Sequence, residues 1–185
     1  YFDVLYHQDH PELGSRKVPF SKHLFIEKDD FVVTKPNNKY KRLSLGDEVR
    51  LFYAYFIKAV DVVYNDEGEV VEVLATYDPE TRSGSGFNSR KPNGTIHFVS
   101  ATHAVPAQFN FFGPMIIGDD DMDLMDRFNQ NSWEKKFGYV EEALGDVKPQ
   151  DKFQFMRNGY FNTDLDSKKD HLIFNEIVPL KSSYK

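Results

Sequence analysis

The sequence contains no cysteine, which excludes disulfide bonds and thiolate metal sites. It also lacks any apolar run near the roughly 18 residues that a membrane-spanning helix needs, and no signal peptide is visible, so we expect a cytoplasmic protein without membrane contact. Positive charge is in deficit, because the formal net charge is −6. General binding to polyanions is therefore not expected, although a few local basic groups can still face a nucleic acid.

Motifs for catalysis or metal binding are missing as well. Gly84 and Gly86 lie in a polar loop without the strand and helix that flank a phosphate-binding loop, which indicates a flexible turn. His7 and His10 have the spacing of metal ligands, but no third ligand is near them, so two solvated histidines are the simpler interpretation. The acidic run at residues 119–123 lacks the ligand order of an EF-hand. The sequence thus predicts no catalytic residue, no metal ligand and no cofactor for this chain.

Aromatic residues are abundant, with 17 phenylalanines and 10 tyrosines, and they favour strands. The clearest signal is a hairpin, because residues 49–64 and 70–77 are aromatic and β-branched and flank a turn cluster at residues 65–68. One helix is expected near residues 119–128, because its acidic start suits a helix N-terminus. Further short strands are expected at residues 24–27, 95–100, 153–155, 160–161, 172–174 and 177–178. The pattern predicts an all-β fold of one or two antiparallel barrels or a sandwich, with a minor helix.

Loops of this β-rich chain carry arginine, lysine, glutamine and aromatic residues. Proteins that read unpaired RNA bases use such groups, because flat side chains stack on a base and an arginine fork donates two hydrogen bonds to a base or a phosphate. On an ordinary surface the same groups are merely solvated. Composition by itself leaves both interpretations open.

Five segments of the chain form a recognisable series. The most specific is Gly-Thr-Ile-His-Phe-Val-Ser-Ala at residues 94–101, followed by His-Ala-Val-Pro at residues 103–106. The others are Gly-Ser-Arg-Lys-Val-Pro-Phe-Ser at 14–21, Leu-Gly-Asp-Glu-Val-Arg-Leu at 45–51, Thr-Tyr-Asp-Pro-Glu-Thr at 76–81 and Gln-Phe-Met-Arg-Asn-Gly-Tyr-Phe at 154–161. In this order they resemble the C-terminal anticodon-binding region of the glutaminyl-tRNA synthetases, a class I family, over nearly the whole chain.

The resemblance implies two antiparallel six-stranded β-barrels of the kind also seen in a ribosomal protein family. Residues 1–17 would be a linker and the first strand of the barrel proximal to the catalytic domain, residues 18–108 the distal barrel and residues 109–185 the rest of the proximal barrel. The implied partners are the anticodon loop of tRNA(Gln) and the enzyme's own catalytic domain, and we expect a monomer. The resemblance implies that the full-length enzyme would use ATP and magnesium. Neither ATP-binding signature of the class is present in this chain, so we expect it to bind tRNA and to catalyse nothing.

The resemblance also assigns residues to the anticodon bases, which the family unstacks and holds in separate pockets. Arg16, Gln154 and Arg157 match the family positions that read the central uridine. Uracil offers carbonyl acceptors and one N–H group, so arginine donors and a glutamine amide distinguish it from cytosine or a purine. This mechanism requires the three side chains to come together in the folded protein.

Three further residues are expected to contact RNA. Arg90 and Lys91 lie in a loop that resembles the family's pocket for an outer base, with Ser89 where a glycine is usual. Tyr53 lies near the pockets, where relatives carry asparagine, so stacking would partly replace hydrogen bonding. Around Asn110 the chain departs from the family, because relatives carry an Arg-Leu-Tyr-Asp-Arg-Leu-Phe-like stretch there.

Two other functions stay open at this stage. The archaeal- and eukaryotic-type glutamyl-tRNA synthetases have related C-terminal barrels, although the segment at residues 154–161 favours the glutaminyl side. A barrel module that binds only proteins is the other alternative, and it would show no salt-dependent affinity for tRNA.

Overall fold

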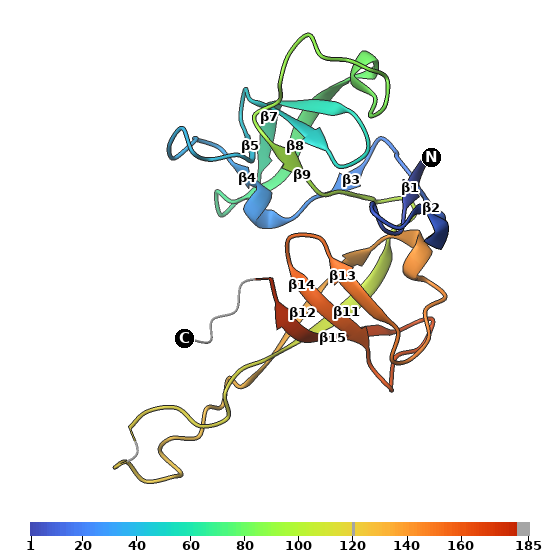
Figure 1. The fold of residues 1–185 in the computed structure, drawn as a ribbon. Helices are drawn as coiled ribbons and strands as arrows, with labels where there is room; N and C mark the ends of the chain where they lie inside the picture. Colours follow the sequence, from blue (N-terminus) through green and yellow to red (C-terminus); the bar gives the residue numbers. More distant parts are fainter. Residues whose placement is uncertain (120, 181–185) are drawn as a thin grey trace. The chain divides into compact units, whose positions relative to one another are not determined.

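The computed structural model describes residues 1–119 and 121–180, and within them the chain is almost entirely β-structure (Figure 1). Fifteen strands run through these residues. The only helical elements there are four single turns of 3-10 helix: η1 (Pro11–Leu13), η2 (Lys28–Asp30), η3 (Pro79–Thr81) and η4 (Glu142–Leu144). The predicted all-β class is confirmed.

The chain divides into two compact units, Tyr1–His103 and Ala104–Lys185. Across the described residues the strands form a four-stranded sheet, a five-stranded sheet and three two-stranded ladders, and backbone hydrogen bonds close none of them into a barrel. The division into two six-stranded barrels, with boundaries after residues 17 and 108, stays a prediction.

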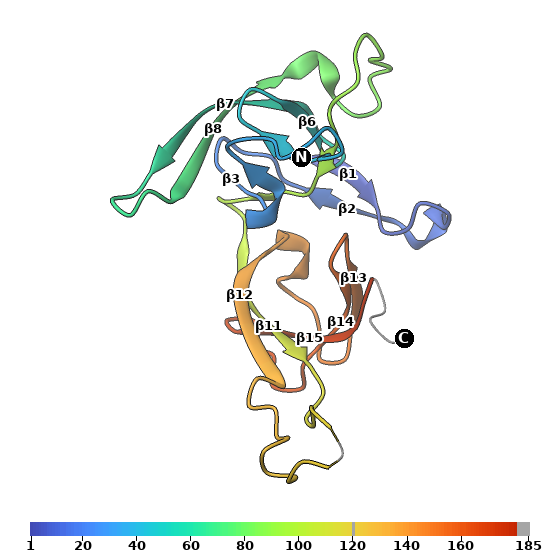
Figure 2. The same ribbon diagram turned by 90° about the vertical axis from the view of Figure 1, so that its left-hand side faces the viewer.

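The four-stranded sheet of the first unit is built around the predicted hairpin. Its strand order is β8 (Val70–Asp78), β7 (Phe56–Tyr64), β6 (Glu48–Leu51) and β9 (Thr95–Ile96). β7 and β8 are antiparallel, and their far ends extend beyond the shorter strands as a two-stranded ribbon (Figure 2). Asn65 closes the turn, because its side-chain oxygen accepts from the backbone N–H groups of Glu67 and Glu69.

Three two-stranded ladders complete the first unit: β1 (Phe2–Leu5) with β2 (Ser15–Val18), β3 (Leu24–Phe25) with β10 (Val99–Ser100), and β4 (Phe31–Val32) with β5 (Leu43–Ser44). Alternation along β6 turns Val49 and Leu51 inward, into a core that they share with Val4, Leu43 and Ile96. Since Val4 is buried there, residues 1–17 contribute to the core of the first unit.

The second unit contains the five-stranded sheet. Its strand order is β12 (Trp133–Val140), β11 (Val105–Phe112), β15 (Leu172–Pro179), β14 (Gly159–Thr163) and β13 (Lys152–Phe155). Neighbouring strands are antiparallel except for β11 and β15, which are parallel. One face of the sheet carries an aromatic core, in which the rings of Phe155 and Phe161 lie 5.1 Å apart and those of Phe109 and Phe174 lie 5.7 Å apart.

A chain of side-chain amides crosses from β11 to β15 on the face opposite that core. Gln108 donates to Asn110 at 2.8 Å, Asn110 donates to Asn175 at 2.7 Å, and Asn175 donates to the carboxylate of Asp164. Gln108 and Asn110 are buried, and a buried amide without partners is costly. The amide chain therefore stabilises the register in which Asn110 pairs with Asn175.

The prediction of a helix near residues 119–128 is wrong for residues 119 and 121–128, which the structure describes as non-helical. Asp120 lies outside the described residues. The segment between β11 and β12 is a series of turns, closed by an isolated bridge between Ile116 and Phe128. The Asp123 side chain accepts from the backbone N–H of Met125, which favours a turn. Leu124 is 64% exposed and Met125 is 80% exposed, so the apolar side of a helix would have had nothing to pack against.

Candidate nucleic-acid interface

The predicted RNA-binding residues are distributed over both units. Arg16, Tyr53, Arg90 and Lys91 belong to the first unit, whereas Gln154 and Arg157 belong to the second. The convergence of Arg16 with Gln154 and Arg157 stays a prediction.

Gln154 and Arg157 are carried by one tight hairpin, formed by β13 and β14. Inward Phe155 belongs to the aromatic core, so alternation turns the adjacent Gln154 outward, where it is exposed and pairs in register with Tyr160. Arg157 lies in the turn with a φ of 69°, a left-handed conformation that residues other than glycine rarely adopt. Residue 159, just after the turn, is glycine, and a β-carbon at this position would lie only 2.8 Å from the carbonyl oxygen of Val178.

Arg16 lies on β2, paired in register with Val4 of β1. Its side chain is half-buried, and Nη1 donates to the carbonyl oxygen of Leu5 at 3.3 Å. This bond holds the guanidinium beside the ladder.

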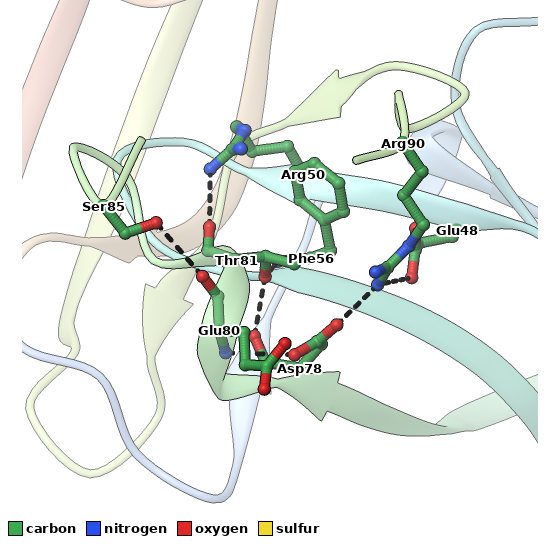
Figure 3. Close-up of polar contacts among 8 residues, drawn as sticks. All are labelled: Glu48, Arg50, Phe56, Asp78, Glu80, Thr81, Ser85 and Arg90. Carbon is green, nitrogen blue, oxygen red and sulfur yellow. Dashed lines mark hydrogen bonds and ion pairs between the residues drawn. The ribbon is translucent and has the colours of Figure 1, made fainter. Parts of the chain in front are cut away.

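Arg90 is held by two carboxylates. Its Nε and Nη2 donate to the two oxygens of Glu48, both at 2.8 Å, and Nη2 also donates to Asp78 at 2.7 Å (Figure 3). The guanidinium lies over the rings of Phe87 and Phe56, at 5.1 Å and 5.5 Å. These carboxylates raise the pKa of Arg90 above its ordinary value, and the hydrogen bond from Arg90 lowers the pKa of Asp78. An RNA contact by Arg90 must compete with these partners.

Lys91, unlike its neighbour Arg90, is not held by carboxylates among the described residues. Its side chain is exposed, and within residues 1–119 and 121–180 its ammonium makes no ion pair and no hydrogen bond. Its charge is therefore available to a ligand.

Sequence reasoning missed the basic segment at residues 39–42. The Asn93 side chain donates to the carbonyl oxygens of Tyr40 and Arg42, at 3.1 Å and 2.8 Å, so this segment lies beside the loop of Lys91. Lys39, Lys41 and Lys91 form what we call the basic cluster, three exposed lysines in a chain of net charge −6. The run Lys-Tyr-Lys-Arg was the available signal, but the sequence does not show that it adjoins residues 91–94.

Tyr53 lies at the tip of the turn between β6 and β7, with a φ of 60°. Its hydroxyl accepts a hydrogen bond of 3.0 Å from the Gln8 side chain, and its ring packs edge-on against Phe52 at 4.8 Å. Arg50 holds the turn from inside, because its Nη1 donates to the carbonyl oxygen of Ala54. Burial of its guanidinium lowers the pKa of Arg50.

Beside Tyr53 lies a cavity of about 370 Å³ within the first unit. Its lining residues are Phe2, Asp3, Tyr53, Arg82, Ser83 and Gly84. Most of this lining is polar, and one wall is aromatic. Arg82 was not among the predicted RNA-binding residues.

The described part of the chain contains neither a metal-binding cluster nor a membrane-spanning helix. No group of three or more histidine, cysteine, aspartate or glutamate side chains in residues 1–119 and 121–180 could hold a metal ion. His10 instead bonds through Nδ1 to Glu12 at 2.9 Å. No helix in the same residues has the length and apolar character needed to cross a membrane.

Comparison with known proteins gives a consistent result over nearly the whole chain. Residues 1–78 and residues 95–164 each match a family described as tRNA synthetases class I (E and Q), anti-codon binding domain. A glutamine–tRNA ligase of Clostridioides difficile is 49% identical over 178 residues, which is 93% of this chain and 32% of that protein. Those of Clostridium perfringens and Nitrobacter hamburgensis are 46% and 40% identical, over 93% and 98% of this chain. The chain spans about a third of the length of these relatives.

Proposed function

The chain belongs to the anticodon-binding domain family of the class I tRNA synthetases for glutamate and glutamine, and on this premise we propose that it binds the anticodon loop of tRNA(Gln). In this proposal Arg16, Gln154 and Arg157 grip the central uridine after it leaves the base stack. The arginines donate to the carbonyl oxygens of uracil, and the Gln154 amide can both donate and accept.

The β13–β14 hairpin is the observation that carries this proposal. It presents an outward amide and a guanidinium three residues apart, on a turn fixed by the hydrogen bond of 3.0 Å from the Asn158 N–H to the Phe155 carbonyl. A left-handed residue other than glycine costs free energy, and such residues are concentrated at binding sites. Arg157 fits that pattern, since its φ is 69°.

The first unit would supply the contacts to the outer bases and to the phosphates. The basic cluster provides positive charge, because Lys91 has no intramolecular partner among the described residues. Tyr53 would stack on a base or bond to its edge. Arg90 would hold the loop in place through Glu48 and Asp78, and would reach RNA only by exchanging one of these carboxylates for a phosphate.

The whole protein is proposed to attach glutamine to tRNA(Gln) with ATP and magnesium, since its relatives are named glutamine–tRNA ligases. This chain would act in the cytoplasm as the monomeric RNA-reading part, folded as two six-stranded barrels. Glutamine-dependent ATP–pyrophosphate exchange by the isolated chain would contradict the assignment of chemistry to other parts of the protein.

The test is the affinity of the chain for anticodon stem-loops, measured by fluorescence anisotropy at several salt concentrations. We expect binding that weakens as salt rises, and a loss of about 1–3 kcal/mol when the central uridine is replaced by cytidine. A stem-loop with the last anticodon base of a glutamate tRNA should bind less well than the glutamine form. Equal binding of all three RNAs would refute the proposal, and stronger binding of the glutamate form would favour a glutamyl-tRNA synthetase.

A further inference from the structure

A second cavity lies within the second unit, and the proposed function does not use it. It opens on the face of the five-stranded sheet opposite the aromatic core, over β12, β11 and the start of β15, which are labelled in Figure 1. Its volume is about 250 Å³. Pockets for drug-sized ligands have volumes of roughly 300–1,000 Å³, so this cavity suits a smaller group such as one side chain. The lining residues that carry chemistry are Gln108, Phe137, Tyr139, Asp170 and His171.

The amide chain from Asp164 to Gln108 ends at this cavity, and its direction is fixed at the Asp164 end. An ionised carboxylate only accepts, so Asn175 must donate to it with its amide nitrogen. The Asn175 oxygen then accepts from Asn110 at 2.7 Å, and the Asn110 oxygen accepts from Gln108 at 2.8 Å. Every amide nitrogen is thus turned toward Asp164, which leaves the Gln108 Oε1 at the free end of the chain.

The Oε1 atom of Gln108 is an acceptor without a donor. The residue is only 9% exposed, and within residues 1–119 and 121–180 no group donates to this oxygen. A buried acceptor that lacks a donor costs free energy, and amides in a hydrogen-bonded chain polarise one another, which strengthens the acceptor at the end. The cavity therefore favours a ligand that carries N–H donors.

The charge of the lining favours a cation. Asp170 is its only acidic residue, and no lysine or arginine lines the cavity. Among the described residues the exposed carboxylate of Asp170 has no ion pair and no hydrogen bond. The preceding Lys169 is paired with Asp146 at 2.7 Å. The exposed imidazole of His171 offers one further acceptor nitrogen in its neutral form.

Two aromatic rings favour a flat cation. Phe137 pairs in register with Gln108, so strand alternation places both on the same face, together with Tyr139. Phe137 is 76% exposed and Tyr139 is 50% exposed. A cation is attracted to the face of an aromatic ring, and a guanidinium also stacks on it because it is planar and weakly hydrated. The N–H groups of a guanidinium match the Gln108 oxygen and the Asp170 carboxylate.

The sheet edge beside the cavity favours a protein segment as the source of the guanidinium. β12 is the outer strand of the five-stranded sheet, and it pairs with no described strand except β11. Its second edge therefore has backbone N–H and C=O groups with which an extended segment can pair. Side chains of such a segment alternate between the two faces, so an arginine on the cavity face would lie next to Phe137 and Tyr139.

We propose that this cavity binds the guanidinium of an arginine, carried by an extended segment of a partner protein that pairs with β12. Gln108 Oε1 and the Asp170 carboxylate accept its N–H groups, and the rings of Phe137 and Tyr139 contact its flat face. The inference does not rest on anticodon binding, because none of these residues belongs to the predicted RNA-binding set.

A direct test titrates the isotope-labelled chain with N-acetylarginine amide. The Gln108 side-chain amide and the backbone amides of residues 137–139 are followed by NMR. We expect saturable shifts with a dissociation constant on the order of 1 mM, because the probe is small. The citrulline analogue has nearly the same shape without the charge and should bind about 5-fold more weakly. No saturable shift with the arginine probe overturns the proposal, and equal binding of the citrulline probe overturns the assignment of a cation.

A second titration identifies the source of the guanidinium. The pentapeptide Thr-Val-Arg-Val-Thr with blocked ends should bind about 10-fold more tightly than the single amino-acid probe, because it adds backbone hydrogen bonds to β12. The amides of residues 133–140 should then shift as well. Replacing the arginine of the peptide by citrulline should remove most of this gain. If the peptide binds no more tightly than the single arginine, the partner segment is refuted and a small guanidinium compound is the ligand.

Variants of exposed lining residues locate the probe on the protein. Asp170→Asn and Phe137→Ala should each weaken binding of the arginine probe about 3-fold, since one ion pair or one ring contact is lost. Asp166→Asn and Phe112→Ala are the matched controls, because each removes the same group from an exposed position outside the lining. The thermal midpoints of all four variants should stay close to that of the parent, since the side chains are exposed. Equal weakening by the controls would place the probe outside the cavity.

The anticodon stem-loop separates this inference from the proposed function. Asp170→Asn and Phe137→Ala should keep the parent's affinity for the stem-loop, whereas Arg157→Ala should not. If the arginine probe binds as expected but the stem-loop does not bind, the anticodon proposal fails alone. If both lining variants bind the probe like the parent while stem-loop binding is intact, the cavity assignment is wrong and the anticodon proposal stands.

Discussion

Gly94 lies directly against the backbone of Lys41, so closely that a β-carbon at residue 94 would be 1.8 Å from the Lys41 carbonyl oxygen. This approach brings together two segments about fifty residues apart in the chain. It is supported by the Asn93 side chain, which bonds to the carbonyl oxygens on both sides of Lys41. The basic cluster therefore depends on a position where only glycine fits.

Gly94→Ala should displace the basic cluster. The added methyl group meets backbone, which cannot move aside like a flexible side chain, so we expect a loss of about 1–3 kcal/mol in the free energy of unfolding. Urea unfolding measures this. Gly138→Ala is the matched control, because a β-carbon there meets only the Phe109 ring at 3.6 Å. Equal stability of the two variants would contradict the close approach at Gly94.

Lys91→Ala should weaken RNA binding without changing stability. The lysine is exposed, and within the described residues its ammonium has no partner, so its removal costs the fold little. If Lys91 contacts one phosphate, the salt slope of stem-loop binding should fall by about 0.7, with equal loss for all anticodon sequences. An unchanged salt slope would place Lys91 away from the RNA.

Arg157→Ala and Arg157→Gly separate base reading from backbone strain. Both variants lose the guanidinium and should cost about 1–3 kcal/mol of binding to the cognate stem-loop. Glycine tolerates a φ of 69°, so Arg157→Gly should be more stable than Arg157→Ala by up to about 1 kcal/mol. Chemical unfolding and anisotropy measure the two effects. Parent-like binding by either variant would refute the role of Arg157 in the pocket.

Arg90→Ala should change the titration of Asp78. In the parent, the hydrogen bond from Arg90 is the main cause that lowers the pKa of Asp78. Without it, the pKa should rise toward the ordinary value for aspartate, which NMR of the side-chain carbon can follow. Arg90→Lys should restore only part of the shift, because a lysine cannot bridge Glu48 and Asp78 with a planar fork.

Acid should destabilise the chain as the pH falls below about 4, the ordinary range for aspartate. The folded-state pKa of Asp47 is lowered by the Ser44 hydroxyl and the Lys35 ammonium, and that of Asp164 by the Asp166 N–H and the Asn175 amide. A lowered pKa gives stability that is fully present above the unfolded pKa and is lost as the pH falls through the folded one. Urea midpoints from pH 7 to pH 2.5 test this, and Asp47→Asn should flatten the profile.

Local chemistry made part of this structure predictable. The β7–β8 hairpin followed from its aromatic and β-branched strands and from Asn65 and Gly68 in the turn, all of which act within a few residues. The outward direction of Gln154 likewise follows from strand alternation beside Phe155.

The remaining features depend on contacts between distant parts of the chain. The helix expected near residues 119–128 had a suitable start but no surface to cover, which the local sequence does not reveal. The pairing of residues 39–42 with Asn93 and Gly94 has no periodic signal in either segment. The two carboxylates of Arg90 are 42 and 12 residues away, so sequence alone could not show that its charge is already engaged.

The amide chain from Gln108 to Asp164 has a consequence for how β15 pairs with β11 as the chain is synthesised. β11 leaves the ribosome well before β15, and the two strands must then find each other in parallel alignment. If β15 docked one residue out of step, Asn175 would turn toward the aromatic core and Asn110 would be buried without its acceptor. The amides thus reinforce the native alignment of the late strand, because the same slip would also turn Phe174 out of the aromatic core.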